Sequence, residues 1–168
     1  SAQAATDHST KTAKSGAPIC FQPLCFDSKS ISAALASFNL AAFPNAQVKV
    51  ADAEAFDLSG FDSVWLDPAR RDLERKSAKH ITLTPADFSP NLNWCFGIEK
   101  PKGIKLGPAF PLELIPDHVE SQWVSHQGDL VELTLWSEGL TSKLGRSALM
   151  LRDGQRFVFE GDGIERSE

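Results

Sequence analysis

The chain has 168 residues, of which 42% are hydrophobic and 23% are charged, and its formal net charge is −5. These proportions are typical of a globular chain that can bury a core, and they exclude low-complexity and fibrous proteins. The acidic balance argues against wholesale nonspecific binding to nucleic acid, but it does not exclude a local basic site.

The cysteine content and the hydropathy suggest a cellular compartment. Cys20, Cys25 and Cys95 lie in apolar surroundings, which indicates buried thiols in a reducing compartment and no metal site. No apolar run approaches the length of a membrane span, and no charged-then-apolar leader opens the chain. We therefore expect a soluble cytoplasmic protein without a membrane partner.

The beginning of the chain predicts a polar lead and then a buried strand. Residues 1–17 are small and polar without periodicity, so we expect a disordered lead or a cloning remnant outside the fold. The apolar run Ile19–Phe26 predicts a first strand that ends at Asp27. A helix over 29–42 should follow, capped by Asp27 or Ser28. One helical face of this segment is apolar, with the spacing of Ile31, Leu35, Phe38 and Ala42.

Two further strands are predicted, and each of them also ends at an acid. Gln47–Ala51 alternates in hydropathy and ends at Asp52, and Asp62–Leu66 ends at Asp67. The order strand, helix, strand, strand is βαβ-like and predicts parallel pairing. Acids at the carboxyl ends of parallel strands lie where open α/β sheets bind ligands.

The third of these strands leads into a basic segment. Pro68 prevents the strand from continuing past Asp67, and Arg70 and Arg71 follow at once, an arrangement suited to an anionic partner. Residues 70–80 hold five basic and two acidic side chains. In an acidic chain this segment is the natural candidate for contact with nucleic-acid phosphate.

The second half of the chain has a different pattern. A short helix is expected within 84–96, and Ile104–Leu106 predicts a fourth strand. From residue 112 onward we expect an antiparallel β meander, with hairpin signals at Gln127-Gly128-Asp129 and Asp153-Gly154. Its short strands are predicted at His118–Ser125, Leu130–Trp136, Ser147–Leu151 and Arg156–Phe159. Residues 113–168 carry five basic and eleven acidic side chains.

Several blocks of this sequence together resemble one protein family. They are Asp67-Pro68-Ala69-Arg70-Arg71, Ile104-Lys105-Leu106-Gly107-Pro108, Gln122-Trp123-Val124-Ser125 and Gly128-Asp129-Leu130-Val131-Glu132. The chain resembles bacterial class I S-adenosylmethionine-dependent methyltransferases with a C-terminal THUMP-like domain. The resemblance implies an α/β fold with a partial Rossmann-like sheet over 18–111, followed by a THUMP-like β domain over 112–168.

The resemblance also implies roles for individual residues. Asp27 corresponds to the acid that binds the ribose hydroxyls of the cofactor, and Asp52, with Ala53 beside it, to the acid that faces the adenine amino group. Asp67, Pro68 and Ala69 correspond to the catalytic loop that orients the acceptor amine, and Asp67 also borders the cofactor. Contact with RNA is expected from the basic side chains that follow, namely Arg70, Arg71, Arg75 and Lys76.

Two features of the sequence depart from the family. A strand with a Gly-x-Gly-like turn should precede Ile19, but Gly16 stands alone there, and no aromatic residue follows Pro68. We therefore expect a fragment of an RNA methyltransferase that acts on a base amino nitrogen and is inactive by itself. The alternative is a non-catalytic RNA- or protein-binding module on a degenerate methyltransferase scaffold. The strand edge left exposed where the family's first strand is missing could drive self-association, as a result of truncation.

Each candidate residue also has a purely structural interpretation. Asp27 can cap the following helix, Asp52 can be an ordinary surface acid, and Asp67 can form an Asx turn. The arginines at 70 and 71 can pair with neighbouring acids. Trp123 and Trp136 fit the core of the β domain better than a base-stacking surface.

Overall fold

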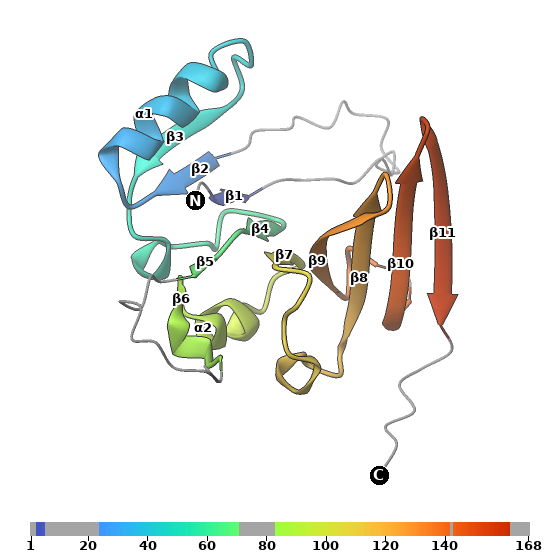
Figure 1. The fold of residues 1–168 in the computed structure, drawn as a ribbon. Helices are drawn as coiled ribbons and strands as arrows, with labels where there is room; N and C mark the ends of the chain where they lie inside the picture. The colour runs from blue at the N-terminus through green and yellow to red at the C-terminus, as the bar shows by residue number, and fades with distance from the viewer. Residues whose placement is uncertain (1–2, 6–23, 71–82, 142, 162–168) are drawn as a thin grey trace, which may run out of the picture. The chain divides into compact units, whose positions relative to one another are not determined.

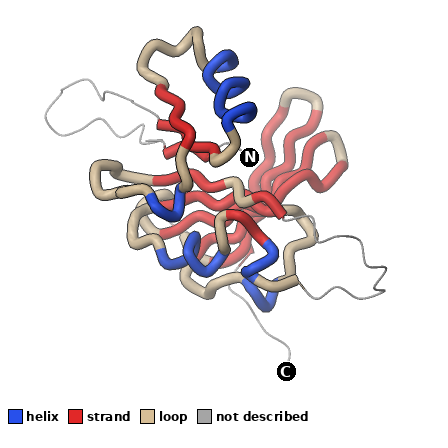
Figure 2. The backbone as a smooth tube through the Cα atoms, turned by 90° about the vertical axis from the view of Figure 1, so that its left-hand side faces the viewer, coloured by secondary structure: helices blue, strands red, loops and turns tan. Residues whose placement is uncertain are grey.

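The computed structural model describes residues 3–5, 24–70, 83–141 and 143–161. The chain divides into two compact units, Ser1–Lys100 and Pro101–Glu168. Both are shown in Figure 1, and Figure 2 shows that strands predominate over helices. The protein is thus mixed α/β and mostly sheet, as the sequence indicates at this coarse level. Within the described residues, no helix has the length and apolar character needed to cross a membrane.

The first unit is built on a small mixed sheet with the strand order β4-β1-β2-β3. Its strands are β1 (Gln3–Ala5), β2 (Leu24–Asp27), β3 (Gln47–Val50) and β4 (Val64–Leu66). β2 and β3 pair in parallel, whereas β1 pairs antiparallel with both β2 and β4. Every residue of β2 is buried, and so are Val64 and Leu66 of β4. The apolar run before Asp67 is therefore a buried strand, as predicted.

The strand β1 corrects the prediction for the first residues of the chain. Residues 1–17 were expected outside the fold, but Gln3–Ala5 pairs with β2 through Gln3↔Phe26, Ala4↔Cys25 and Ala5↔Leu24. A short alanine-containing segment has no hydropathy pattern that marks a strand. Its pairing depends on two partners that lie far away in the sequence.

The helix α1 (Ser30–Asn39) forms where the sequence predicts it, but its apolar face is not the buried face. Ala33 is the buried residue of this helix, whereas Ile31, Leu35 and Phe38 are 76%, 61% and 80% exposed. Periodicity reports which side chains share a face, and packing decides which face meets the sheet. The face that meets the sheet is the one that bears Ala33. α1 and β3 lie side by side (Figure 1).

The rest of the first unit consists of short elements. A 3-10 turn, η1 (Ala53–Ala55), follows β3, and β5 (Ala69–Arg70) follows β4 and pairs with β6 (Phe88–Ser89). The single helix expected within 84–96 is divided into η2 (Pro85–Asp87) and α2 (Leu92–Gly97). Pro90 lies between them and cannot continue a helix begun before it.

The second unit is a sheet with the strand order β11-β10-β8-β9-β7. Its elements are β7 (Lys102–Leu106), η3 (Leu112–Leu114), β8 (Val119–His126), β9 (Asp129–Ser137), β10 (Gly145–Arg152) and β11 (Gln155–Gly161). Because β7 pairs with β9, Ile104–Leu106 belongs to this unit. The unit boundary therefore lies at residue 100, and not at residue 111 as the sequence analysis placed it.

The prediction of an antiparallel meander is only partly correct. Both hairpin signals are confirmed, because Gln127-Gly128 and Asp153-Gly154 adopt positive φ at both positions and connect antiparallel strands. However, β10 pairs in parallel with β8, from Gly145↔Glu120 to Leu151↔His126. The connection from β9 to β10 passes the beginning of β8 and does not form a hairpin.

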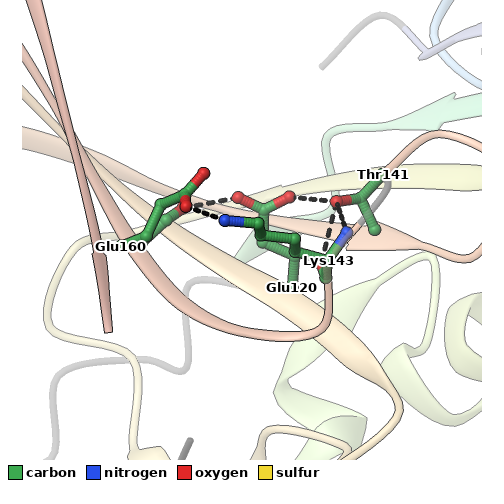
Figure 3. A network of polar contacts seen from close by, with 5 residues as sticks. Glu120, Thr141, Lys143 and Glu160 are labelled. Carbon is green, nitrogen blue, oxygen red and sulfur yellow. Dashed lines mark hydrogen bonds and ion pairs between the residues drawn. The ribbon is translucent and has the colours of Figure 1, made fainter. Parts of the chain in front are cut away.

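A polar network holds this crossover connection in place (Figure 3). The Glu120 carboxylate on β8 accepts a hydrogen bond from Ser147 Oγ on β10 at 2.5 Å and another from Thr141 Oγ1 in the connection. Thr141 Oγ1 also accepts a hydrogen bond from Lys143 N at 3.1 Å, and Lys143 Nζ forms an ion pair with Glu160 on β11. The Glu120 carboxylate thus joins β8 to both the connection and β10.

Candidate functional site

The structure brings the three strand-end acids of the first unit to one edge of its sheet. β2 is parallel to β3, and β2 and β4 are both antiparallel to β1, so β2, β3 and β4 all run in the same direction. Asp27 is the last residue of β2, Asp52 lies just beyond β3, and Asp67 directly follows β4. This edge, defined by Asp27, Asp52 and Asp67, is called the acidic edge below.

Asp27 is the most buried of the three acids, with 5% of its surface exposed. Its Oδ1 accepts a hydrogen bond from Lys29 N at 2.8 Å, and its backbone oxygen accepts one from Ala51 N at 3.1 Å. The first bond fixes the chain just before α1, but Lys29 is the N-cap of that helix and no side chain caps it, so the predicted capping by Asp27 or Ser28 is wrong. The second joins the ends of β2 and β3, so the carboxylate has a defined position at the acidic edge.

Asp52 is exposed and holds the turn that follows β3. Its Oδ1 accepts a hydrogen bond from Glu54 N at 3.0 Å, which places Asp52 at the N-cap of η1. Ala53 begins this turn and is half-buried. The sequence predicts an acid after the second strand, and the structure confirms its position at the end of that strand.

An aromatic cluster lies beside this turn, and the sequence analysis did not single it out. The Phe56 ring lies 4.2 Å from the Phe26 ring and 6.3 Å from the Phe61 ring, between centroids. Lys49 Nζ lies 5.7 Å from the centroid of Phe56. The sequence gives one hint of this cluster, namely Phe56 and Phe61 in the polar connection between β3 and β4. Their contact with Phe26 depends on the fold and not on sequence spacing.

Asp67 and the residues after it form a short ladder and not an open loop. Asp67 is half-buried and Pro68 is buried, whereas Ala69 and Arg70 are exposed and pair with Ser89 and Phe88. The structure therefore holds Asp67 between a buried strand and a second small sheet. The predicted RNA-binding residues Arg71, Arg75 and Lys76 lie outside the described residues.

Arg70 lies close to an acid with a perturbed pKa. Asp87 accepts hydrogen bonds from Thr84 N at 2.7 Å and from Thr84 Oγ1 at 2.9 Å. These bonds lower the pKa of the Asp87 carboxyl, and the charge of Arg70 lowers it further. Part of the positive charge of Arg70, an exposed residue, is thus balanced by Asp87.

Replacing Thr84 with alanine should raise the pKa of Asp87 toward its ordinary value, because one of the two hydrogen bonds to the carboxylate is lost. A lowered pKa in the folded state stabilises the fold above the unfolded value of about 4. That contribution is lost as the pH falls through the folded pKa. The measurement is a carboxyl-carbon NMR titration. Arg70→Ala should give a smaller rise, and an unchanged Asp87 pKa in Thr84→Ala would contradict the assignment.

Two long-range hydrogen bonds support the acidic edge. Glu54 Oε1 accepts from Asn91 N at 2.8 Å, and Asn91 Oδ1 in turn accepts from Asn93 N at 2.8 Å to cap α2. Lys100 Nζ donates to the backbone oxygen of Ser59 at 3.1 Å. The turn after β3 is thereby connected to the start of α2. Because these pairs are far apart in the sequence, no local pattern could predict them.

The buried thiols and the acids of the described residues form no metal centre. Cys25 and Cys95 are free and buried, and burial raises the pKa of the Cys25 thiol. Cys20 lies outside the described residues. No group of three histidine, cysteine, aspartate or glutamate side chains in the described residues is arranged to hold a metal ion.

The acidic edge can be compared with the cofactor that the family resemblance implies, S-adenosylmethionine. Carboxylates at the acidic edge are suitable acceptors for hydroxyl and amino donors of a nucleoside. The methionine half requires a glycine turn at the same edge. The described strand before residue 19 is β1, which contains no glycine and runs antiparallel, so its carboxyl end lies at the opposite edge. The described residues therefore do not form that part of the site.

Comparisons with protein-family models, with curated proteins and with solved structures give no significant match to this chain. The function is therefore inferred from the chemistry and geometry of the acidic edge.

Proposed function

We propose that this chain carries the nucleoside-binding and acceptor side of an S-adenosylmethionine-dependent RNA methyltransferase with a Rossmann-like sheet. The observation that supports the proposal most directly is the acidic edge: Asp27, Asp52 and Asp67 end three strands that run in the same direction. The carboxyl edge of such a sheet is the usual position for a nucleotide. The proposed acceptor is an amino nitrogen of a base in tRNA or rRNA, and the proposed location is the cytoplasm.

The chain's own residues have distinct roles in this proposal. Asp27 accepts hydrogen bonds from the ribose hydroxyls, and Asp52 with Ala53 holds the adenine side, next to the Phe56 ring. The cofactor, when bound, supplies the methyl group. Asp67, with the backbone of Pro68 and Ala69, accepts hydrogen bonds from the target amine and orients it. Catalysis by this edge is then mainly a matter of positioning.

The proposed RNA contact lies in the first unit. Arg70 is exposed beside the acidic edge, and the following segment, outside the described residues, is rich in basic side chains. Residues 101–168 carry seven basic and eleven acidic side chains, so the second unit is a poor partner for phosphate. An exposed arginine can bind phosphate or stack on a base through its guanidinium plane.

Replacing Asp27 with alanine should weaken S-adenosylmethionine binding at least about tenfold, because a buried acceptor for the ribose is removed. The measurement is isothermal titration calorimetry on the folded chain. The matched control is Asp62→Ala, since Asp62 is exposed and precedes β4, at the opposite edge. Asp27→Asn retains an acceptor for Lys29 N and separates a folding defect from a binding defect. Equal affinity in Asp27→Ala and the wild type would overturn the assignment.

A second candidate function is a non-catalytic RNA- or protein-binding module on a methyltransferase scaffold. The direction of β1 favours it, because the described residues place no glycine turn at the acidic edge. No saturable cofactor binding by the folded chain, together with RNA binding whose salt dependence becomes shallower in Arg70→Ala, would support this module over the enzyme.

A further inference from the structure

The strand β11 forms an open edge of the second unit. It pairs with β10 from Arg152↔Gln155 to Arg146↔Gly161, and no described strand pairs with its other side. All residues of β11 are exposed. Among them are three consecutive apolar residues, Phe157, Val158 and Phe159, with 40%, 44% and 57% of their surfaces exposed.

This edge lacks the usual protection against pairing with another chain. Edge strands are commonly short, interrupted by proline or a bulge, or lined with lysine. β11 has seven residues, contains neither proline nor lysine, and pairs with β10 in unbroken register. Its charged residues are one arginine and one glutamate, Arg156 and Glu160, which flank the apolar residues on either side.

The backbone groups that face the open edge can be assigned from the register. The carbonyl oxygen of Leu151 accepts from Gln127 N at 2.9 Å, so this part of β10 bonds away from β11. Leu151 is opposite Arg156. Antiparallel pairs alternate between hydrogen-bonded and non-bonded, so the backbone N–H and C=O of Arg156, Val158 and Glu160 point to the open edge.

The sequence of this edge is complementary to itself. When two copies of Arg156-Phe157-Val158-Phe159-Glu160 run antiparallel about Val158, Val158 lies opposite its own copy, Phe157 opposite Phe159, and Arg156 opposite Glu160. We propose that β11 pairs with β11 of a second copy of this chain and so forms a twofold symmetric dimer with a continuous sheet. A twofold interface requires a self-complementary surface of this kind.

The side chains agree with this register on both faces of the sheet. Directly opposed residues share a face, so Phe157 and Phe159 lie on the face of Met150 and Ala148, to which they are opposed in β10. Pairing brings the phenylalanines of both copies together there. On the other face Arg156 of one copy meets Glu160 of the other. The Glu160 carboxylate already accepts the ion pair from Lys143 (Figure 3), so it would lie between two cations.

The backbone contributes in the same register. Arg156, Val158 and Glu160 are the residues whose groups point outward, and they are also the residues that oppose one another in the proposed pair. Each such pair exchanges both of its N–H···O bonds. A shift by one residue would place a residue whose backbone groups point to the open edge opposite one whose groups point to β10, and these bonds would be lost. The side-chain pairs and the backbone hydrogen bonds therefore specify the same register.

The test is the mass of the whole chain in a dilution series up to about 1 mM by sedimentation equilibrium, a range that includes weak interfaces. The expected result is a dimer of twice 18.3 kDa. Arg156→Glu should raise the dissociation constant about tenfold, because both ion pairs become repulsive. The double variant Arg156→Glu/Glu160→Arg should restore it to within about threefold of the wild-type value. Val158→Lys should abolish the dimer, because two lysines would lie opposite each other.

The matched control for Val158→Lys is Leu130→Lys, because Leu130 is 52% exposed and lies on β9 between two other strands. This variant should dimerise like the wild type. Circular dichroism shows whether each variant folds. A monomer at every concentration overturns the proposal, and so does a dissociation constant that is unchanged in Arg156→Glu and Val158→Lys. Failure of the double variant to recover would exclude the proposed register. None of these results depends on the proposed function.

Discussion

Replacing Leu133 with alanine should lower the free energy of unfolding of the second unit by about 3 kcal/mol, within the range for buried Leu→Ala substitutions. Leu133 lies in β9 with none of its surface exposed. Its neighbours in register are Trp123 on β8 and Leu106 on β7. The substitution removes three carbons from the middle of the sheet, where both neighbouring strands are fixed by hydrogen bonds. The cavity cannot close without disturbing those bonds, which is why we expect a large effect.

Leu130→Ala on the same strand is the matched control. Leu130 is 52% exposed, so its truncation should change the free energy of unfolding by less than about 0.5 kcal/mol. Urea unfolding followed by tryptophan fluorescence measures both variants, because Trp123 and Trp136 lie in β8 and β9. Similar effects of the two substitutions would show that the face bearing Leu133 is not the core of this unit.

Replacing Glu120 with alanine should destabilise the second unit by about 2 kcal/mol, the magnitude of hydrogen bonds to a charged group. The carboxylate accepts from Ser147 Oγ and from Thr141 Oγ1, and these bonds connect β8 to β10 and to the preceding connection. In Glu120→Ala both hydroxyl groups lose the carboxylate as their acceptor, although Thr141 Oγ1 can then donate to the carbonyl oxygen of Lys143. Glu120→Gln retains a single carbonyl acceptor and should have about half the effect.

Glu113→Ala provides the comparison for the loss of one negative charge, since Glu113 is exposed in η3. It should leave the urea midpoint nearly unchanged. Removing one negative charge from this acidic unit should stabilise it slightly. If Glu120→Ala stabilises the unit as much as Glu113→Ala does, the hydrogen bonds of Glu120 contribute nothing to the free energy of unfolding.

The elements that could be predicted from the sequence are those with a local signal. Val64-Trp65-Leu66 forms a strand because three large apolar residues lie between polar turns, and Asp67-Pro68 ends it. Asp153-Gly154 forms a tight turn because glycine tolerates positive φ. The three acids of the candidate site could be found in the same way, since each lies at or just beyond the end of a recognisable strand.

The features that could not be predicted depend on distant partners. Gln3–Ala5 has no strand signal of its own and pairs only because β2 and β4 offer free edges. The apolar stripe of α1 is visible in the sequence, but the helix buries Ala33 and leaves Ile31, Leu35 and Phe38 of that stripe exposed. The Glu54–Asn91 bond spans 37 residues, and no periodicity extends so far.

The parallel pairing of β8 with β10 has a consequence for the cooperativity of the second unit. The hairpins β8–β9 and β10–β11 each close over a turn of a few residues, whereas the pair Glu120↔Gly145 closes a much longer stretch of chain. Closing a longer loop costs more conformational entropy. An isolated hairpin is marginally stable in water, so the free energy of forming one hairpin does not offset the entropy lost in closing this loop. The two hairpins and the ladder between them therefore stabilise one another, and the unit gains its stability only when all of its strands are joined.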